Sequence, residues 1–388
     1  MKKSEAGKDK EIMNIGIDIS QIVYEGTGVS RFTHGLTHAI LEYDRKNKWL
    51  FFFSSLRRRL SSNLEKKIID KGHTLIKWRL PPSLLSFFWN DLHAFSKLFT
   101  FNFKLLTSLD WFITSDWTEP PLSIQKATVI HDLAYLRYPE TVDEKVLKTQ
   151  GKRLEWVKKE SSVIFADSYA TKEDLVSCLK LEPRSIHVIY PGVEVGKPSQ
   201  GEIQKTIKKY ELDRPFILTV GKIEPRKNLK RLIEAFRSLQ KKDIDLIIVG
   251  QKGWNALPSG YGATNVKYLG FISDQELYSL YSSCLFFVYP SLWEGFGYPI
   301  VEAMKLNAAV ATSKTSSLKE IAENSAILFD PFDIEEIRSA LVTLLEKPNL
   351  REDLRKKGAQ RSKLFTWKRY YEEMIKTLSN FKPYVNRN

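Results

Sequence analysis

The stretch from residue 290 to residue 299 reads Pro290-Ser291-Leu292-Trp293-Glu294-Gly295-Phe296-Gly297-Tyr298-Pro299. It joins a strand predicted at residues 285–288 to a helix predicted at residues 299–304. Two glycines that flank a phenylalanine let the backbone bend and approach a ligand closely. Glu294 precedes the helix and can accept hydrogen bonds from ligand hydroxyl groups, and Glu302 lies within the helix. A carboxylate that only stabilises the helix dipole is the alternative.

A second charged loop lies upstream, between a predicted strand at residues 215–220 and a predicted helix at residues 229–240. It reads Gly221-Lys222-Ile223-Glu224-Pro225-Arg226-Lys227-Asn228. The cations stand where backbone N–H groups and the dipole of the helix favour an anion, and a diphosphate would suit that position. A solvated basic turn is the interpretation that position alone leaves open.

Strands and helices alternate along most of the chain, which is typical of parallel α/β sheets. Strands are predicted at residues 12–19, 49–54, 74–77, 111–114, 127–130, 162–166, 187–189, 245–249 and 266–268. Helices are predicted at residues 32–43, 143–160, 171–179 and 274–282. The pattern breaks near Pro191-Gly192-Val193. We therefore predict an N-terminal Rossmann-like domain at residues 1–195, a linker at 196–213, a C-terminal Rossmann-like domain at 214–364, and a helix at 365–388 that returns to the first domain.

Composition supports two large cores, because 43% of the 388 residues are hydrophobic, and it excludes a disordered or fibrous chain. The net charge of +14 favours anionic partners. Cys178 and Cys284 show neither a C-x-x-C pair nor zinc-ligand spacing, so free buried thiols in a reducing compartment are expected. Residues 1–11 carry no apolar signal region, and no apolar run is long enough to span a membrane. We expect a cytoplasmic protein.

The two charged loops resemble glycosyltransferase family 4, a group of retaining, nucleotide-sugar-dependent enzymes with the GT-B fold, and the likeness extends over nearly the whole chain. The Glu294-x7-Glu302 spacing and the Glu224–Asn228 run are its most specific signals. Other motifs follow in the family's order: Thr27-Gly28-Val29-Ser30-Arg31-Phe32, Val129-Ile130-His131-Asp132-Leu133, Ala166–Lys172 and Tyr190–Val193. The resemblance implies two doubly wound parallel-sheet domains that face each other across a cleft, where open α/β sheets bind ligands.

The resemblance also implies a role for each matching residue. Lys227 would bind the donor diphosphate, helped by Arg226 or by Lys222, which stands near the position of an arginine in many relatives. Gly28 would approach the same diphosphate from the first domain.

The remaining carried-over residues concern the donor sugar, the nucleoside and the reacting centre. Glu294 would bind sugar hydroxyls, with the backbone of Gly295, Phe296 and Gly297 closing over sugar and phosphate. Glu302 would bind the ribose, and Gly270 and Phe271 would lie against the base. His131 would face the reacting centre, so His131 and Glu294 are the expected catalytic residues; a lone histidine at a strand end is otherwise more often structural.

Within the family, the combined motifs look most like bacterial mannosyltransferases of polysaccharide and O-antigen assembly. The resemblance therefore implies retaining transfer of a hexose, mannose from GDP-mannose, to a saccharide acceptor in surface polysaccharide biosynthesis. A UDP-sugar donor, or a GT-B-type sugar-nucleotide epimerase, is the alternative. No cofactor or metal is expected beyond the nucleotide sugar. Asp243-Ile244-Asp245 matches a D-x-D metal pattern, but it leads into a predicted buried strand far from the phosphate loop, so a solvated strand entry is the simpler interpretation.

Residues 44–104 concentrate the positive charge, with 13 Lys and Arg against 4 Asp and Glu. Arg57-Arg58-Arg59 follows Phe51-Phe52-Phe53, and more aromatic residues follow up to residue 103. Cations beside aromatic rings suit an anionic membrane surface, which would make the protein peripheral on the inner face of the plasma membrane and its acceptor lipid-linked, for example on polyprenyl diphosphate. Aromatic side chains of the first domain's core are the alternative. Nucleic acid is not an expected partner.

Overall fold

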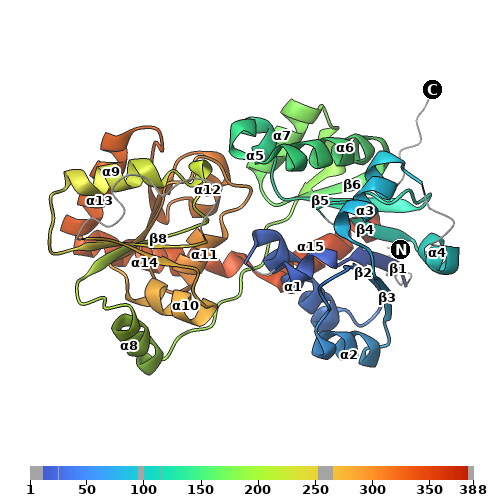
Figure 1. The fold of residues 1–388 in the computed structure, drawn as a ribbon, viewed down its shortest axis with the longest axis horizontal. Coiled ribbons are helices and arrows are strands. Elements are labelled where there is room, and N and C mark those ends of the chain that lie inside the picture. Colours follow the sequence, from blue (N-terminus) through green and yellow to red (C-terminus); the bar gives the residue numbers. More distant parts are fainter. Residues whose placement is uncertain (1–11, 25, 95–99, 115, 252–264, 383–388) are drawn as a thin grey trace, which may run out of the picture.

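The structure is a computed structural model of the 388-residue chain, and it describes residues 12–24, 26–94, 100–114, 116–251 and 265–382. It contains two parallel sheets, one in each half of the chain, which lie side by side in Figure 1. Their strands are almost continuously apolar, as expected for parallel sheets that helices cover on both faces. The predicted α/β fold class is confirmed.

The N-terminal sheet has seven strands in the order β3-β2-β1-β4-β5-β6-β7. They are β1 (Asn14–Asp18), β2 (Lys48–Ser54), β3 (Thr74–Trp78), β4 (Trp111–Thr114), β5 (Gln125–Ile130), β6 (Ser161–Ala166) and β7 (Ile186–Val188). Its helices are α1 (Gly28–Tyr43), α2 (Ser62–Asp70), α3 (Pro82–Ser86), α4 (Thr100–Thr107), α5 (Ala134–Arg137), α6 (Glu144–Glu160) and α7 (Tyr169–Leu179). Residues of α1 and α2 pack in the core on one face, and residues of α3, α4 and α6 pack on the other.

The C-terminal sheet has six strands in the order β10-β9-β8-β11-β12-β13. They are β8 (Phe216–Val220), β9 (Asp245–Val249), β10 (Val266–Gly270), β11 (Phe286–Tyr289), β12 (Val310–Ser313) and β13 (Ala326–Phe329). Helices α10 (Asp274–Ser283), α11 (Tyr298–Lys305) and α12 (Ser316–Ala322) cover one face, and α9 (Leu229–Ser238), α13 (Ile334–Glu346) and α14 (Pro348–Arg361) cover the other.

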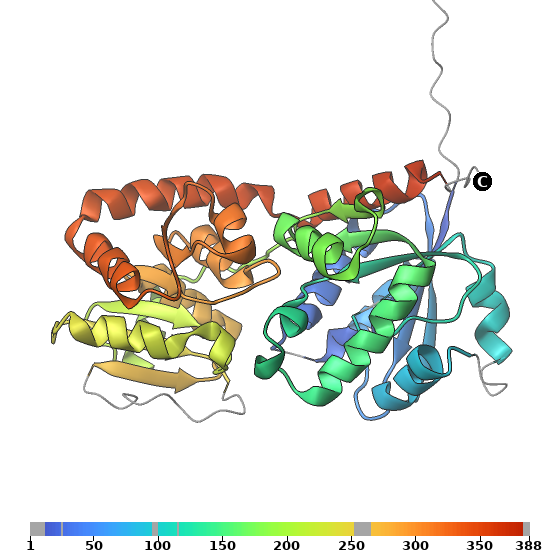
Figure 2. The same cartoon turned by 90° about the horizontal axis from the view of Figure 1, so that it is seen from above.

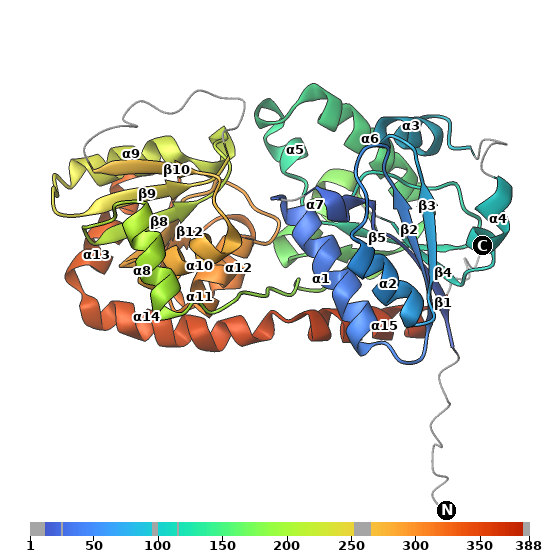
Figure 3. The same cartoon turned by 60° about the horizontal axis from the view of Figure 1, so that its bottom comes forward.

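The last helix, α15 (Trp367–Asn380), leaves the C-terminal domain and packs against α1 of the N-terminal one. Figures 2 and 3 show α14 and α15 running along one side of both domains. Trp367 fits where two glycines leave room, because a Cβ atom at Gly35 or Gly192 would come within 1.9 Å or 2.3 Å of Trp367 atoms. Phe365, just before α15, is buried in the core of the C-terminal domain. The end of the chain therefore ties the two domains together.

Local sequence signals explain two differences from the predicted elements. Helix α1 begins at Gly28, four residues earlier than predicted, because the hydroxyl of Thr27 accepts a hydrogen bond from the Ser30 N–H and caps it. The predicted linker contains helix α8 (Gln200–Lys209), which a Ser199–Glu202 capping box begins. Both helices begin at a polar capping residue, and apolar periodicity does not reveal such a start in the sequence.

Three further expectations can be compared with the structure. Cys284 is buried, but Cys178 is exposed, so the expectation that both thiols are buried is wrong for Cys178, on the short helix α7. Phe51, Phe52 and Phe53 lie in the core of the first domain, as the alternative for residues 44–104 predicts, while residues 95–99 lie outside the described residues. Among the described helices, none has both the length and the apolar character needed to cross a membrane.

Candidate active site

Two loops at the carboxyl ends of β8 and β11 meet in the C-terminal domain. The first loop contains a single helical turn, Pro225–Lys227, and then Asn228, whose backbone is left-handed with φ 56°. The side-chain amide of Asn228 donates to the carbonyl oxygens of Pro290 at 3.1 Å and Pro331 at 2.6 Å. Because Asn228 is buried and both bonds go to other loops, it fixes Lys227 beside the stretch that begins at Pro290.

Glu294 is the centre of this site. Its Oε1 atom accepts hydrogen bonds from Lys227 Nζ at 2.5 Å, Ser291 Oγ at 2.5 Å and Tyr289 OH at 2.9 Å. Its Oε2 atom lies 3.0 Å from Arg226 Nη1. Burial raises the pKa of Glu294, but the charges of Arg226 and Lys227 outweigh burial and lower that pKa to about 2. The carboxylate is therefore ionised and held in one orientation.

The two cations differ in how well they are compensated. Arg226 also pairs with Glu224 at 2.8 Å and donates to the Trp293 carbonyl at 2.5 Å, and its pKa is raised because Glu294 and Glu224 outweigh its burial. Burial and the charge of Arg226 lower the pKa of Lys227, although Glu294 opposes them. An additional anion near Lys227 would stabilise its charged form.

Glu302, on α11, is buried and contacts the other domain. Its Oε1 forms an ion pair with Nη1 of Arg31 from α1, and its Oε2 accepts from Tyr281 OH at 3.2 Å. Arg31 also pairs with Asp274 of the C-terminal domain at 2.9 Å. Burial raises the pKa of Glu302, and Arg31 opposes that rise. Arg31 thus joins the glycine loop of the first domain to the carboxylate that the resemblance assigns to the ribose.

His131 follows β5 and lies at the contact between the two domains. Its Nδ1 atom is 2.7 Å from Asp167 Oδ2, and its ring meets Phe32 edge to face, with centroids 4.6 Å apart. Burial lowers the pKa of His131, but Asp167 outweighs burial and raises it. The backbone there is close to Gly295, where an added Cβ atom would lie 1.9 Å from the His131 carbonyl oxygen. Only glycine permits this approach, which brings His131 and the Glu294 loop together.

The remaining predicted residues are spread around these contacts. Gly270 ends β10 with φ +73°, and Phe271 is 65% exposed, with its ring against the Gly26 loop that leads to Gly28. Lys222 is exposed at the start of the cationic loop.

Phe296 and Gly297 belong to the loop of Glu294. The side chain of Phe296 packs in the core, so only its backbone can face a ligand, and Gly297 caps α11 with φ +100°.

The sequence argument did not single out the partners that hold these residues. Ser291 and Glu224 lie inside the two quoted loops, Tyr289 directly precedes one of them, and Arg31 and Asp167 lie inside quoted motifs. Their position in a motif or at a strand end was the available signal. Asp245 of the D-x-D pattern starts β9, as the predicted strand entry requires, and pairs with Arg214 at 3.4 Å and Lys267 at 3.3 Å. Asp245 is buried, so the expectation that this entry is solvated is wrong for Asp245, whose charge the two cations compensate. Within the described residues, no cluster of three or more His, Cys, Asp or Glu side chains is arranged to hold a metal ion.

Comparison with known proteins gives this arrangement a family. Residues 201–361 match the family model described as glycosyl transferases group 1. The C-terminal half is a glycosyl transferase group 1 domain. This group 1 domain contains Lys227, Glu294 and Glu302, whereas Gly28 and His131 lie outside it. The predicted relationship to glycosyltransferases is confirmed.

Two relatives are named for sugar transfer to O-antigen chains. O-antigen chain mannosyltransferase B of Escherichia coli is 32% identical over 179 residues, which cover 44% of this chain and 47% of the relative. O-antigen chain mannosyltransferase RfbU of Salmonella typhimurium is 30% identical over 247 residues, covering 61% of this chain and 65% of the relative. The aligned part thus spans less than two thirds of each relative.

The whole fold is shared with solved structures. Sucrose-phosphate synthase from Thermosynechococcus elongatus superposes with a TM-score of 0.71 at 17% identity, covering 94% of this chain and 98% of that one. At this identity the likeness concerns the fold alone. With the two parallel sheets described above, it confirms the predicted GT-B architecture around the group 1 domain.

Proposed function

We propose that the protein is a retaining glycosyltransferase of family 4 that transfers mannose from GDP-mannose to a lipid-linked saccharide during surface polysaccharide assembly. The cluster of Lys227, Arg226 and Glu294 carries the proposal. It combines an ionised carboxylate with a largely buried lysine, whose pKa is lowered by burial and by Arg226, at the carboxyl end of a parallel sheet, where such sheets bind ligands. The names of the O-antigen mannosyltransferases that the chain resembles support mannose and a polysaccharide acceptor.

The cluster suits the chemistry of a nucleotide sugar. When the bond to the sugar breaks, negative charge grows on the departing diphosphate, and cations already in position stabilise that charge without reorganisation. Lys227 would supply this charge, since Arg226 is already held by two carboxylates. Glu294 would accept hydrogen bonds from sugar hydroxyls, and Glu302 from the ribose. Glu294 is fixed by four donors, so it would hold the sugar in one orientation.

His131 would act on the opposite side of the sugar, from the N-terminal domain. Its Nδ1 is bound to Asp167, and the raised pKa favours the protonated ring. The Nε2–H group could then donate a hydrogen bond to an oxygen of the donor sugar. The contact of Gly295 with the His131 carbonyl would bring this group to the sugar that Glu294 holds.

The acceptor would lie on the N-terminal domain, whose basic residues 57–59 are exposed. A location at the inner face of the plasma membrane, without a metal cofactor and without nucleic acid as a partner, completes the proposal. Anionic vesicles are expected to retain the wild type. Equal retention of a variant with Arg57, Arg58 and Arg59 replaced by serine would contradict the role of those arginines.

A donor screen followed by product analysis tests the function. GDP-mannose and a set of UDP-sugars are each added to the protein, and the rise in melting temperature is measured, because a ligand that binds only the folded state stabilises it. The best donor is then incubated with a polyprenyl-diphosphate-linked saccharide. We expect free GDP only when the acceptor is present and an α-linked mannose in the product by NMR. Turnover of the donor without any acceptor, or a β-linked product, would contradict the proposal.

A further inference from the structure

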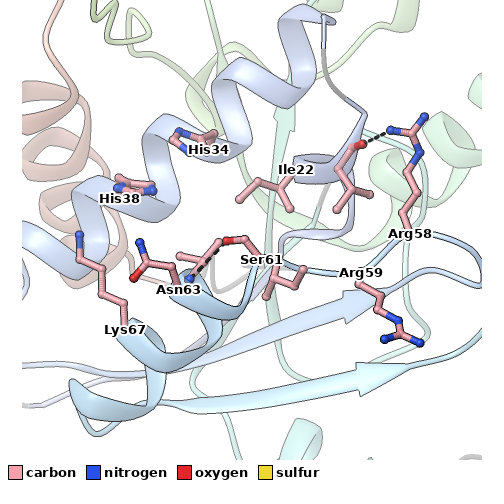
Figure 4. Close-up of a pocket in the computed structure, with 11 residues that line it drawn as sticks. Ile22, His34, His38, Arg58, Arg59, Ser61, Asn63 and Lys67 are labelled. Atoms are coloured by element: carbon pink, nitrogen blue, oxygen red, sulfur yellow. Dashed lines mark hydrogen bonds between the residues drawn. The ribbon is translucent and has the colours of Figure 1, made fainter.

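A cavity of about 580 Å³ lies in the N-terminal domain, away from Lys227 and Glu294. Helix α1 contributes His34 and His38 to its wall, and the start of α2 contributes Ser61, Asn63 and Lys67. Figure 4 shows the imidazoles of His34 and His38 above α2, with Lys67 extending toward His38. Helices α1 and α2 and the segments that precede them thus line an open, basic cavity that the proposed donor site does not use.

The charges that face this cavity are of one sign. The rings of His34 and His38 stack with centroids 4.3 Å apart. Burial, followed by the charges of His34 and Lys67, lowers the pKa of His38 to about 4, and only Glu42 opposes them. None of the described residues that line the cavity is acidic. With this pKa His38 is neutral near pH 7, so Lys67 supplies the positive charge beside the two imidazoles. A bound anion would raise the pKa of His38 and favour its protonated form.

The N-terminus of α2 adds to this preference for an anion. Ser61 caps the helix by accepting from the Leu64 N–H at 3.3 Å, and Ser61 and Asn63 both line the cavity. The nine-residue helix therefore begins at the cavity wall, where its N–H groups and dipole favour negative charge. On the opposite side of the cavity, Arg58 donates a hydrogen bond to the Val23 carbonyl oxygen. Figure 4 shows the Arg59 guanidinium turned away from the imidazoles.

The cavity also has an apolar wall, made by Ile22, Val23, Leu60 and Leu64. A free inorganic anion would leave this wall without a partner. A ligand whose phosphate is attached to a hydrocarbon chain would match both parts, because the phosphate would meet the cations and the chain would cover the apolar side chains.

The cavity lies on the same helix as the donor-facing residues. Gly28 begins α1, and His34 and His38 follow after six and ten residues, which places them about 9 Å and about 15 Å further along the helix axis. Phe32, which lies between Gly28 and His34 on this helix, contacts His131. A phosphate held by His34 and His38 would therefore lie behind the reacting centre, on the acceptor's side.

We propose that this cavity binds the phosphate-bearing end of a lipid acceptor, a diphosphate attached to an isoprenoid chain. The proposal rests on the glycosyltransferase function proposed above. Two sources share the chemistry of phosphate beside hydrocarbon: the lipid-linked acceptor and an anionic phospholipid. The first fits better, because a concave site with an apolar wall beside Lys67 holds one end of one molecule, whereas a membrane surface needs only exposed cations.

Binding of farnesyl diphosphate to the full-length protein, measured by calorimetry in the presence of saturating GDP, tests the proposal. The key pair of variants is Lys67→Gln and Lys66→Gln. The two lysines are neighbours on α2, but only Lys67 lines this cavity, and Lys66 is exposed. We expect Lys67→Gln to weaken binding tenfold or more, since it loses a charged hydrogen bond, and Lys66→Gln to leave it within twofold. His34→Asn should weaken binding as well.

Three further arms separate the possible sources. Farnesol, which lacks phosphate, and inorganic diphosphate are both expected to bind at least tenfold more weakly than farnesyl diphosphate. NMR signals of the His34 and His38 imidazoles should shift with farnesyl diphosphate. Vesicles of phosphatidylglycerol and phosphatidylcholine should retain the Lys67→Gln and Lys66→Gln variants equally. If Lys67→Gln alone loses the vesicles while farnesyl diphosphate does not bind, the assignment to the acceptor is overturned in favour of a phospholipid.

Equal affinity of both lysine variants for farnesyl diphosphate would overturn the cavity itself as the binding site. Loss of farnesyl diphosphate binding in Lys227→Met would also overturn it, since that result would place the ligand in the donor site. The proposed function can fail separately. If nucleotide sugars do not bind while farnesyl diphosphate binding still depends on Lys67, the cavity remains the binding site and the proposed glycosyl transfer is contradicted.

Discussion

Replacing Lys227 by methionine removes one charge and keeps a side chain of similar length. In the folded protein Lys227 Nζ donates to Glu294 at 2.5 Å and Tyr289 at 2.9 Å. Glu294 keeps Arg226 at 3.0 Å, Ser291 and Tyr289 in the variant. The free energy of unfolding should therefore fall by less than the ~3–5 kcal/mol that breaking a lone buried ion pair costs, and the variant should fold.

The effect on the nucleotide should be larger than the effect on folding. Loss of one hydrogen bond between charged groups costs ~1.5–3 kcal/mol, so GDP should bind about 10- to 150-fold more weakly. The same cation would stabilise the charge that develops on the diphosphate, so kcat/KM should fall ~10²- to 10³-fold. Calorimetry gives the first quantity, and the rate of GDP release at limiting GDP-mannose gives the second.

Lys230→Met is the matched control, because Lys230 is an exposed lysine on α9, three residues further along the chain. We expect it to leave both quantities within twofold of wild type. The reasoning is refuted if Lys227→Met binds GDP with wild-type affinity while folded, or if Lys230→Met loses as much affinity as Lys227→Met.

Four other predictions follow from contacts described above. Wild type should bind GDP at least about tenfold more tightly than 2′-deoxy-GDP in calorimetry, since Glu302 would accept from the ribose; Glu302→Ala should bind the two alike, and persistent discrimination would remove that role. Gly295→Ala would push a Cβ to 1.9 Å from the His131 carbonyl, so kcat should fall about 100-fold with GDP affinity unchanged; normal turnover would show that the contact is dispensable. Because Asp167 raises the pKa of His131 above 6.5, its stabilisation is complete below pH 6.5 and is lost as pH rises through the raised value; Asp167→Asn should lower the melting temperature more at pH 6 than at pH 9, and an equal loss would argue against the ion pair. Trp367→Ala should lower the free energy of unfolding in urea by ~3–5 kcal/mol, and a loss below about 1 kcal/mol would mean that α15 does not need this side chain.

The sequence predicted the fold well because parallel strands buried on both faces leave a strong apolar signal. Strands such as β9, predicted and observed at Asp245–Val249, are apolar on both faces. Helix starts were less certain, because the hydroxyl of Thr27 and the Ser199–Glu202 capping box set them through single polar contacts. Helix α8 was missed for that reason, since its residues are mainly polar.

The candidate site was predictable where motif spacing carried it and not where contacts between domains did. Lys227 and Glu294 lie 67 residues apart, yet both follow strands of one sheet, and their side chains meet. The pairing of Arg31 with Glu302 spans 271 residues and depends on how the two domains sit against each other. The closeness of Gly295 to His131 has the same cause, and no local pattern encodes it.

A crystal structure of the protein bound to GDP tests the central claim most directly. The account predicts the diphosphate within hydrogen-bonding distance of Lys227 Nζ and the ribose hydroxyls at the Glu302 carboxylate, with Gly270 and Phe271 beside the base. A nucleotide bound in the N-terminal domain, or in the C-terminal domain without contact to Lys227 and Glu302, would contradict it.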